Sequence, residues 1–159
     1  MKKVKLNLFN EDFKDFIDSL NKFSVEYILI GGYAVILHGY HRTTGDLDVW
    51  VNPTEINYEK LIKAFSFFGF PTDAIDLRKF LNSEAYNVFT FGRPPMAIDI
   101  VTYIQGVDFK DAIQNVKNIE VQGVTVSLLS MSDLIATKKA SNRYKDLDDL
   151  ENLDLENES

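Results

Sequence analysis

The feature that most restricts the fold is a glycine pair placed between two strand-like segments. The segment Val25-Glu-Tyr-Ile-Leu-Ile30 is rich in β-branched and aromatic residues and ends at Gly31-Gly32. This pattern predicts a buried strand closed by a tight turn, followed by a short helix over 33–38. A second strand is predicted over 46–51, because apolar and polar residues alternate there and Asn52-Pro53 follows. Strands that alternate with helices favour a sheet domain covered by helices.

Helical and strand patterns recur along the rest of the chain. Asn10 and Thr54 precede helical patterns and are expected N-caps. Further helices are predicted over 10–20, 54–68, within 71–82, over 109–116, over 130–142 and from about 145, and further strands over 85–91, 97–103 and 124–127, the first two forming a hairpin around 92–95. The expected fold is α/β (α+β), a mixed central sheet flanked by helices. We expect a single domain over 1–159, with an N-terminal helical segment over about 1–24 and C-terminal helices over about 130–156.

Composition limits the class of protein. The 159 residues carry a net charge of -7 and are 45% hydrophobic, with no cysteine. A chain of this kind is expected to be globular, and the absence of cysteine excludes thiolate metal sites and cysteine nucleophiles. The acidic balance argues against a broad nucleic-acid-binding surface. The absence of a signal-peptide core or a long apolar run predicts a cytoplasmic protein without a membrane span.

Two carboxylates at the start of the second strand need an explanation. On a strand, Asp46 and Asp48 share one face, and Leu47 and Val49 share the other. Carboxylates this close repel each other by about 1 kcal/mol in water and by about 4 kcal/mol near a protein surface. A magnesium ion offsets such repulsion, since it is usually bound by one or two carboxylates together with waters and substrate phosphates. Trp50 shares the aspartate face and is either a core residue or a platform for a nucleobase.

A third carboxylate, Asp99, lies inside the strand-like segment 97–103. An ionised side chain among apolar neighbours is unfavourable unless it is paired or bound to a metal. If its strand lies beside 46–51, three aspartates converge and can hold metal ions that position a triphosphate. The alternatives are a solvent-facing Asp-X-Asp pair, a glycine pair that is only a turn, and an Asp99 satisfied by Arg93 or a backbone donor.

The order of these motifs resembles a known superfamily. Gly31-Gly32, then Asp46-Leu-Asp48, then Asp99 on a later strand, is similar to the nucleotidyltransferase superfamily with the DNA polymerase β-like fold. Further motifs narrow the resemblance to the AbiEii-like small nucleotidyltransferases, which occur alone and as partners in toxin–antitoxin systems. These motifs are Gly31-Gly32-Tyr-Ala34, His38-Gly, Arg42-Thr-Thr44, Lys138-Lys-Ala and Arg143-Tyr-Lys-Asp146.

The resemblance implies roles for particular residues. It implies Mg2+, or Mn2+, held by Asp46, Asp48 and Asp99, with Asp99 as the base for an acceptor hydroxyl. It also implies a nucleoside triphosphate bound by a set of six residues. These are Gly31, Gly32, Arg42, Thr44, Lys138 and Arg143. For Lys139 the expectation is different, because a solvated helix face paired with Asp148 or Asp149 explains it better.

Three functions follow as hypotheses. The leading one is a magnesium-dependent nucleotidyltransferase that moves a nucleoside monophosphate to a hydroxyl of RNA, a protein or a small molecule, with a cognate toxin or antitoxin as a further partner. The alternative is a non-catalytic nucleotide-binding or regulatory module with the same fold. A manganese-dependent glycosyltransferase that uses Asp-X-Asp is the third, and the glycine pair before the aspartates argues against it.

Overall fold

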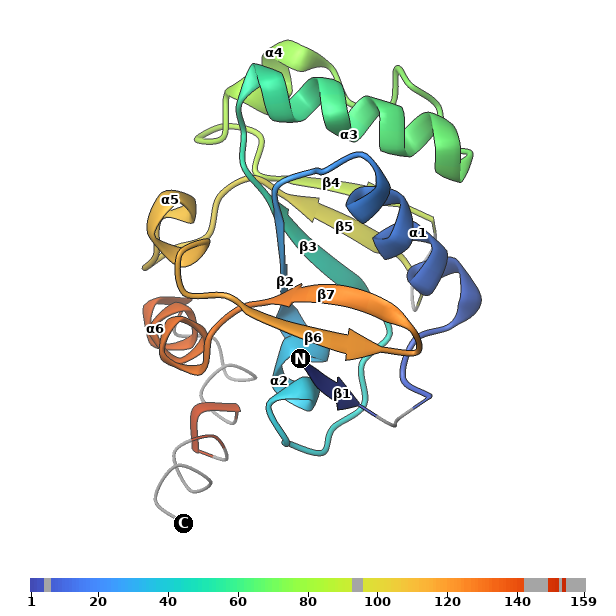
Figure 1. Ribbon diagram of the computed structural model, residues 1–159. Coiled ribbons are helices and arrows are strands. Elements are labelled where there is room, and N and C mark those ends of the chain that lie inside the picture. The colour runs from blue at the N-terminus through green and yellow to red at the C-terminus, as the bar shows by residue number, and fades with distance from the viewer. Residues whose placement is uncertain (5–6, 93–95, 142–148, 152, 154–159) are drawn as a thin grey trace.

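The computed structural model of the protein describes the chain except for residues 5–6, 93–95, 142–148, 152 and 154–159 (Figure 1). Its strands are β1 (Lys2–Val4), β2 (Tyr27–Ile30), β3 (Leu47–Val51), β4 (Val88–Phe91), β5 (Ile98–Val101), β6 (Lys117–Val121) and β7 (Val124–Leu128). Its helices are α1 (Glu11–Lys22), α2 (Gly31–Leu37), α3 (Glu55–Phe68), α4 (Leu77–Leu81), α5 (Phe109–Ala112) and α6 (Met131–Ser141). Residues 149–151 and 153 are also helical.

The described strands form one mixed sheet in the order β1-β6-β7-β2-β3-β5-β4. At its centre β2 runs antiparallel to β3, and β3 runs parallel to β5. The predicted hairpin is present, since β4 pairs with β5 antiparallel and forms one edge of the sheet. The mixed sheet with helices confirms the predicted α/β class.

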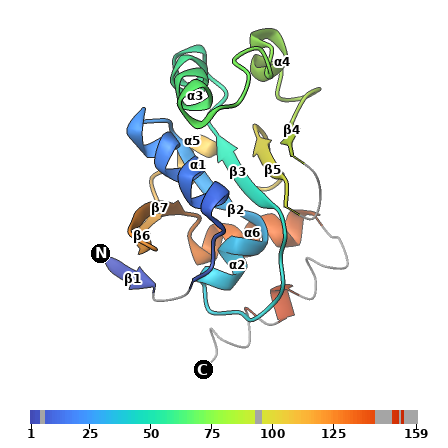
Figure 2. The same cartoon turned by 90° about the vertical axis from the view of Figure 1, so that its right-hand side faces the viewer.

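Helices cover both faces of the sheet. In Figure 2, α1 lies in front of the sheet, α3 stands at its upper end, and α6 lies behind it. The alternation in β3 divides its side chains between these layers: Leu47 and Val49 join the core under α1 and α3. Trp50 joins the core on the other face, where its ring packs edge-on against Phe109 at 5.1 Å between centroids. Trp50 is therefore a core residue, because α5 covers the ring that a nucleobase would need.

Local capping signals give the predicted helix starts. Asn10 accepts a hydrogen bond from the Phe13 N–H at 2.8 Å, and Thr54 accepts one from the Asn57 N–H at 3.2 Å. Ser130 likewise accepts one from the Asp133 N–H at 3.2 Å. In the described part of the chain, no helix is both long and apolar enough to cross a membrane.

Three local expectations differ from the structure. The glycine pair does not form a separate turn, because α2 begins at Gly31 itself directly after β2. Strands β1 and β6 carry charged and amide side chains and were not predicted. They form because of backbone pairing: β1 pairs parallel with β6, and β6 pairs antiparallel with β7. Pairing of this kind requires few apolar residues when the strands are partly exposed, so the sequence pattern did not indicate them.

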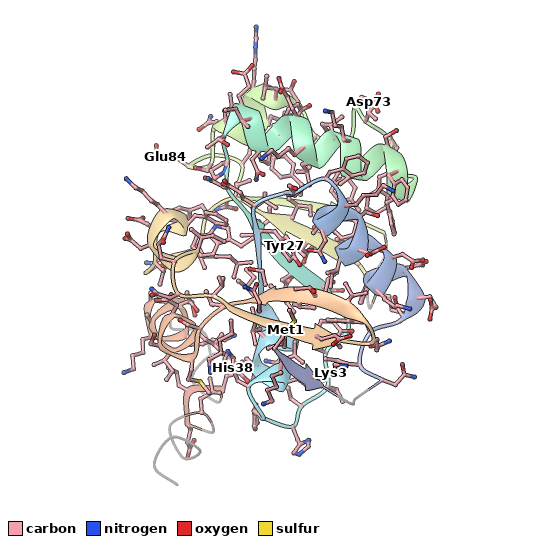
Figure 3. All side chains as sticks on the ribbon, viewed as in Figure 1. Met1, Lys3, Tyr27, His38, Asp73 and Glu84 are labelled. Carbon is pink, nitrogen blue, oxygen red and sulfur yellow. The ribbon has the colours of Figure 1, made fainter. Side chains whose placement is uncertain are left out.

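His38, at the carboxyl end of α2, gives the fold a pH dependence (Figure 3). Its Nε2 lies 2.6 Å from the Leu129 carbonyl oxygen, and burial, opposed by this hydrogen bond and aided by Lys117 and Lys2, lowers its pKa below 6.5. The unfolded chain then binds the proton at His38 more readily, so the contribution of His38 to the free energy of unfolding should fall as the pH drops below about 6.5. The free energy of unfolding at pH 5 minus that at pH 7.5, measured with urea, should be more positive for His38→Gln than for the unaltered protein. Equal differences would contradict this expectation.

Candidate active site

The register of three adjacent strands builds the site. Asp48 on β3 lies directly opposite Ile30, the last residue of β2, and directly beside Asp99 on β5. The parallel pairing of β3 with β5 therefore brings together two of the three predicted aspartates. Both side chains are half-buried. They occupy the face of the sheet that α6 covers, because Asp48 is two residues from Trp50.

The pair of carboxylates is electrostatically strained. Burial, a hydrogen bond with Asp99 and the negative charges of Asp99 and Asp46 raise the pKa of Asp48 to about 7, while the charge of Lys138 opposes the rise. Near neutral pH Asp48 therefore carries a proton more often than an exposed aspartate does. A divalent cation would remove the need for that proton, so this pair suits a hard, oxygen-preferring ion.

Asp46 lies next to the pair and is held separately. It precedes β3, and its Oδ1 accepts a hydrogen bond from the Ala97 N–H at 3.1 Å. Its charge also contributes, after burial, to the raised pKa of Tyr33. Among the described residues no group of three or more His, Asp or Glu side chains stands ready to hold a metal ion. The structure thus brings Asp48 and Asp99 into contact and leaves Asp46 hydrogen-bonded to Ala97, the residue that precedes β5.

The glycine pair makes room for side chains of the site. Gly31 has a φ of +72°, and a Cβ on it would lie 2.9 Å from Asp48 Cγ. A Cβ on Gly32 would lie 2.7 Å from the Cβ of Thr44. The missing side chains therefore let Asp48 and Thr44 approach the first turn of α2.

Gly31→Ala should destabilise the protein more than a matched glycine replacement. Gly123 has a φ of +80° and no atom within 4 Å of a built Cβ, so Gly123→Ala carries the backbone strain of about 1–2 kcal/mol without the clash. Gly31→Ala adds the displacement of Asp48. Urea unfolding of both variants measures the difference, and equal losses would show that the contact with Asp48 does not matter.

Two clefts open onto Asp48. The first, of about 420 Å³, lies between the strand ends and α6 and includes Gly31, Asp99 and Lys138 in its lining. The second, of about 590 Å³, includes Gly32, Thr44 and Asp46. Four of the residues predicted to bind nucleotide are thus divided between two clefts that meet at Asp48, whereas Arg42 lines neither cleft.

Arg42 and Lys138 converge on a buried carboxylate, Asp149, that was not predicted to belong to the site. Asp149 is 1% exposed, and its Oδ2 lies 2.7 Å from Arg42 Nη1 and 3.2 Å from Lys138 Nζ. Lys138 is 7% exposed, whereas Lys139 is exposed, as expected for a solvated face. The cations of the Arg42 loop and of α6 are therefore held side by side by the C-terminal segment.

Two partners in the site had no usable signal in the sequence. Asp149 lies in an acidic tail, where it looks like one of many solvated acids. Thr90 on β4 donates its hydroxyl hydrogen to Asp99 Oδ1 at 2.7 Å, which only the strand register could reveal. The predicted nucleotide-binding residue Arg143 lies outside the described residues, and so does Arg93, the suggested partner of Asp99.

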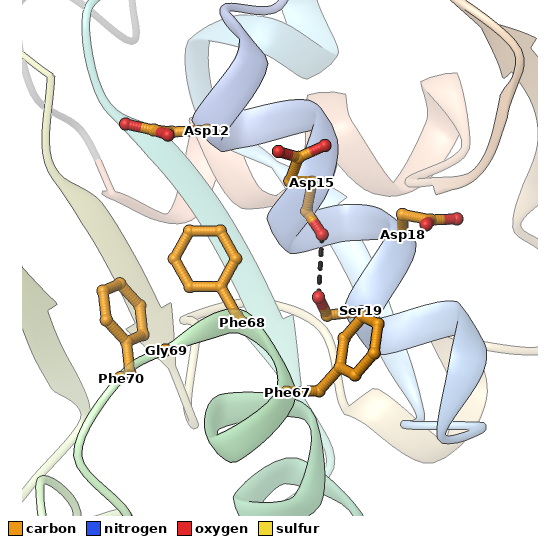
Figure 4. Close-up of a pocket in the computed structure, with 8 residues that line it drawn as sticks. All are labelled: Asp12, Asp15, Asp18, Ser19, Phe67, Phe68, Gly69 and Phe70. Carbon is orange, nitrogen blue, oxygen red and sulfur yellow. Dashed lines mark hydrogen bonds between the residues drawn. The ribbon is translucent and has the colours of Figure 1, made fainter.

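A third hollow lies on the opposite layer, between α1 and the end of α3 (Figure 4). It has a volume of about 400 Å³ and is lined by Asp12, Asp15, Asp18, Ser19, Phe67, Phe68, Gly69 and Phe70. None of the predicted site residues lines it, and Ser19 Oγ bonds the Asp15 carbonyl within α1. The candidate active site is therefore the pair of clefts around Asp48.

Solved structures share this architecture. A candidate nucleotidyltransferase from Thermotoga maritima (TM1012) aligns with a TM-score of 0.57 and 15% identity, over 92% of this chain and 91% of that chain. The lincosamide antibiotic adenylyltransferase LnuA, in its lincomycin-bound form, aligns with a TM-score of 0.53 and 14% identity, over 94% and 98%. At such identities the likeness shows the fold alone.

Sequence comparison gives the family. No curated protein matches the chain significantly. A family model described as "Nucleotidyltransferase of unknown function (DUF6036)" matches residues 5–159, a range that contains all the site residues discussed above. The chain therefore belongs to this family of nucleotidyltransferases.

Proposed function

We propose that the protein transfers a nucleoside monophosphate from a nucleoside triphosphate to a hydroxyl acceptor with the help of magnesium. The observation that carries the proposal is the contact between Asp48 and Asp99, enforced by the parallel register of β3 and β5 and reflected in the raised pKa of Asp48. Two half-buried carboxylates that resist joint ionisation are an unfavourable arrangement unless a cation joins them.

Asp48 and Asp99 would hold Mg2+, or Mn2+, and Asp46 is the third candidate ligand because its charge reaches Asp48. The ion would stabilise the negative charge that develops on the phosphates during transfer. The rest of the chemistry is positioning, as in other phosphoryl and nucleotidyl transfers.

In the proposed reaction, the acceptor oxygen attacks the α-phosphorus and its proton passes to Asp99. The bond from the α-phosphorus to the bridging oxygen breaks, and pyrophosphate leaves with the electron pair. In-line attack requires the acceptor oxygen and the leaving pyrophosphate to lie on opposite sides of the α-phosphorus. Asp48 borders two clefts, so the reacting groups can reach it from two directions. Lys138 lines the first cleft together with Gly31 and Asp99, so its charge favours the triphosphate there, within reach of the proposed base.

The AbiEii-like subgroup and a place in a toxin–antitoxin pair are parts of the same proposal. Their support is the motif set Gly31-Gly32, Arg42, Thr44 and Lys138, which the structure gathers around Asp48 and Asp149. A non-catalytic nucleotide-binding module is the alternative, and it predicts magnesium-dependent binding of triphosphate without transfer.

The test is an acceptor search with a built-in control. Purified protein is incubated with Mg2+ and each α-labelled triphosphate, together with total RNA, a protein extract or small hydroxyl compounds, and mass spectrometry identifies modified products. Asp46→Asn should reduce every product that the unaltered protein forms. Triphosphate binding without any product would favour the non-catalytic alternative, and product that persists undiminished in Asp46→Asn would contradict the role of Asp46.

A further inference from the structure

Asp99 lies on β5 between β3 and β4, and a polar side chain stands beside it on each of these strands. Its register partner on β3 is Asp48, and its register partner on β4 is Thr90. The Thr90 hydroxyl donates to Asp99 Oδ1 at 2.7 Å, a short, charge-assisted contact. Thr90 therefore holds the Asp99 carboxyl group from the side opposite Asp48.

The hydrogen bond from Thr90 is able to set the orientation of the Asp99 carboxylate. The last torsion of an aspartate side chain has broad minima, so packing alone sets the rotation of its two oxygens poorly. Thr90 is β-branched and lies in an extended strand, which restricts its own rotamer and therefore the direction of its hydroxyl. The hydrogen bond fixes Oδ1 on the β4 side of the carboxylate.

Thr90 has no evident role in the stability of the core. It is exposed on the edge strand, while its neighbours Phe89 and Phe91 pack against the main core. A hydroxyl at this position contributes little to folding, since surface substitutions usually change stability by about 0.5 kcal/mol or less. Its one described side-chain hydrogen bond goes to Asp99.

We propose that Thr90 is a positioning residue for Asp99, setting the orientation in which that carboxylate meets a divalent cation and the acceptor hydroxyl. The proposal rests on the proposed function, because it gives Asp99 the same role. Partners that orient metal ligands are typically worth about 10–100-fold in metal affinity or activity.

Binding of Mn2+ alone, followed by isothermal titration or by the electron paramagnetic resonance of the free ion, tests the proposal without an acceptor. Thr90→Val keeps the shape and removes the hydroxyl, and it should weaken Mn2+ binding by about tenfold or more. Thr90→Ser restores the hydroxyl and should restore most of the affinity. Thr125→Val is the matched control, because Thr125 is an exposed strand threonine whose hydroxyl faces the sulfur of Met1 at 4.0 Å instead of a carboxylate.

The outcomes separate the two proposals. If the unaltered protein binds Mn2+, Asp48→Asn does not, and Thr90→Val matches the unaltered protein, the role of Thr90 is wrong and the metal site stands. If the unaltered protein does not bind Mn2+, both proposals fail. If Thr90→Val and Thr125→Val weaken binding equally, the loss is not specific to Asp99 and the role of Thr90 is again wrong. Once an acceptor is known, Thr90→Val should lower kcat more than it raises KM for the triphosphate.

Discussion

Asp48→Asn should reduce nucleotidyl transfer by at least about 100-fold, because even the outer partners of a metal site are worth about 10–100-fold. Asp48 is the residue that both clefts share, and it contacts Asp99. Asparagine keeps the shape and a carbonyl oxygen but cannot supply the negative charge that a magnesium ion prefers. Initial rates with saturating triphosphate and Mg2+ measure the effect.

The fold should survive this change. The pKa of Asp48 of about 7 means that its protonated form is already well populated near neutral pH, and asparagine resembles that neutral form. Asp73→Asn is the control, since Asp73 is exposed in the segment between α3 and α4, away from β3 (Figure 3). A variant that melts like the unaltered protein yet keeps its full rate would exclude Asp48 from the chemistry.

Asp149→Asn should lower the free energy of unfolding by about 3–5 kcal/mol, the usual loss when one partner of a buried ion pair is removed. Asp149 Oδ2 accepts from both Arg42 and Lys138, and its side chain is 2% exposed. Neutralising it leaves two cations in a poorly hydrated position where they repel each other. Urea unfolding monitored by circular dichroism gives the difference directly.

Two further variants make the Asp149 prediction specific. Glu151→Gln removes an exposed acid from the same helical segment and should change stability by less than about 0.5 kcal/mol. The double variant with Asp149→Asn and Arg42→Gln should lose less free energy of unfolding than the two single variants together. The reason is that no unpaired arginine remains when both residues are changed. A loss below about 1 kcal/mol for Asp149→Asn would mean that the triad of Asp149, Arg42 and Lys138 behaves like a surface salt bridge.

The Asp149 triad also bears on nucleotide binding. Arg42 and Lys138 were both predicted to bind nucleotide, and the structure shows both in contact with one carboxylate. Lys138 is part of the lining of the first cleft, so Asp149 holds this cation beside the cleft. The C-terminal segment therefore adds to the site through Asp149.

Much of the local structure follows from short-range rules. The caps Asn10 and Thr54 start α1 and α3 because a side-chain oxygen near a free backbone N–H acts within three residues. The alternation in β3 sends Val49 to one core and Trp50 to the other, because the period of a strand is two residues in any fold. These features need no knowledge of the rest of the chain.

The sequence by itself singled out the residues that we propose to carry the chemistry: a glycine pair, an Asp-X-Asp strand and a later strand aspartate, in an order that resembles nucleotidyltransferases. Only the tertiary structure decided how they meet, because the partner of a strand and the register of the pairing depend on contacts between distant segments. The parallel register of β3 and β5 placed Asp48 beside Asp99, and the hairpin register added Thr90. In the sequence Asp149 is one acid in a charged tail, but the packing of the C-terminal segment makes it the buried partner of Arg42 and Lys138. Only the tertiary structure could show this, because burial is a property of the assembled fold.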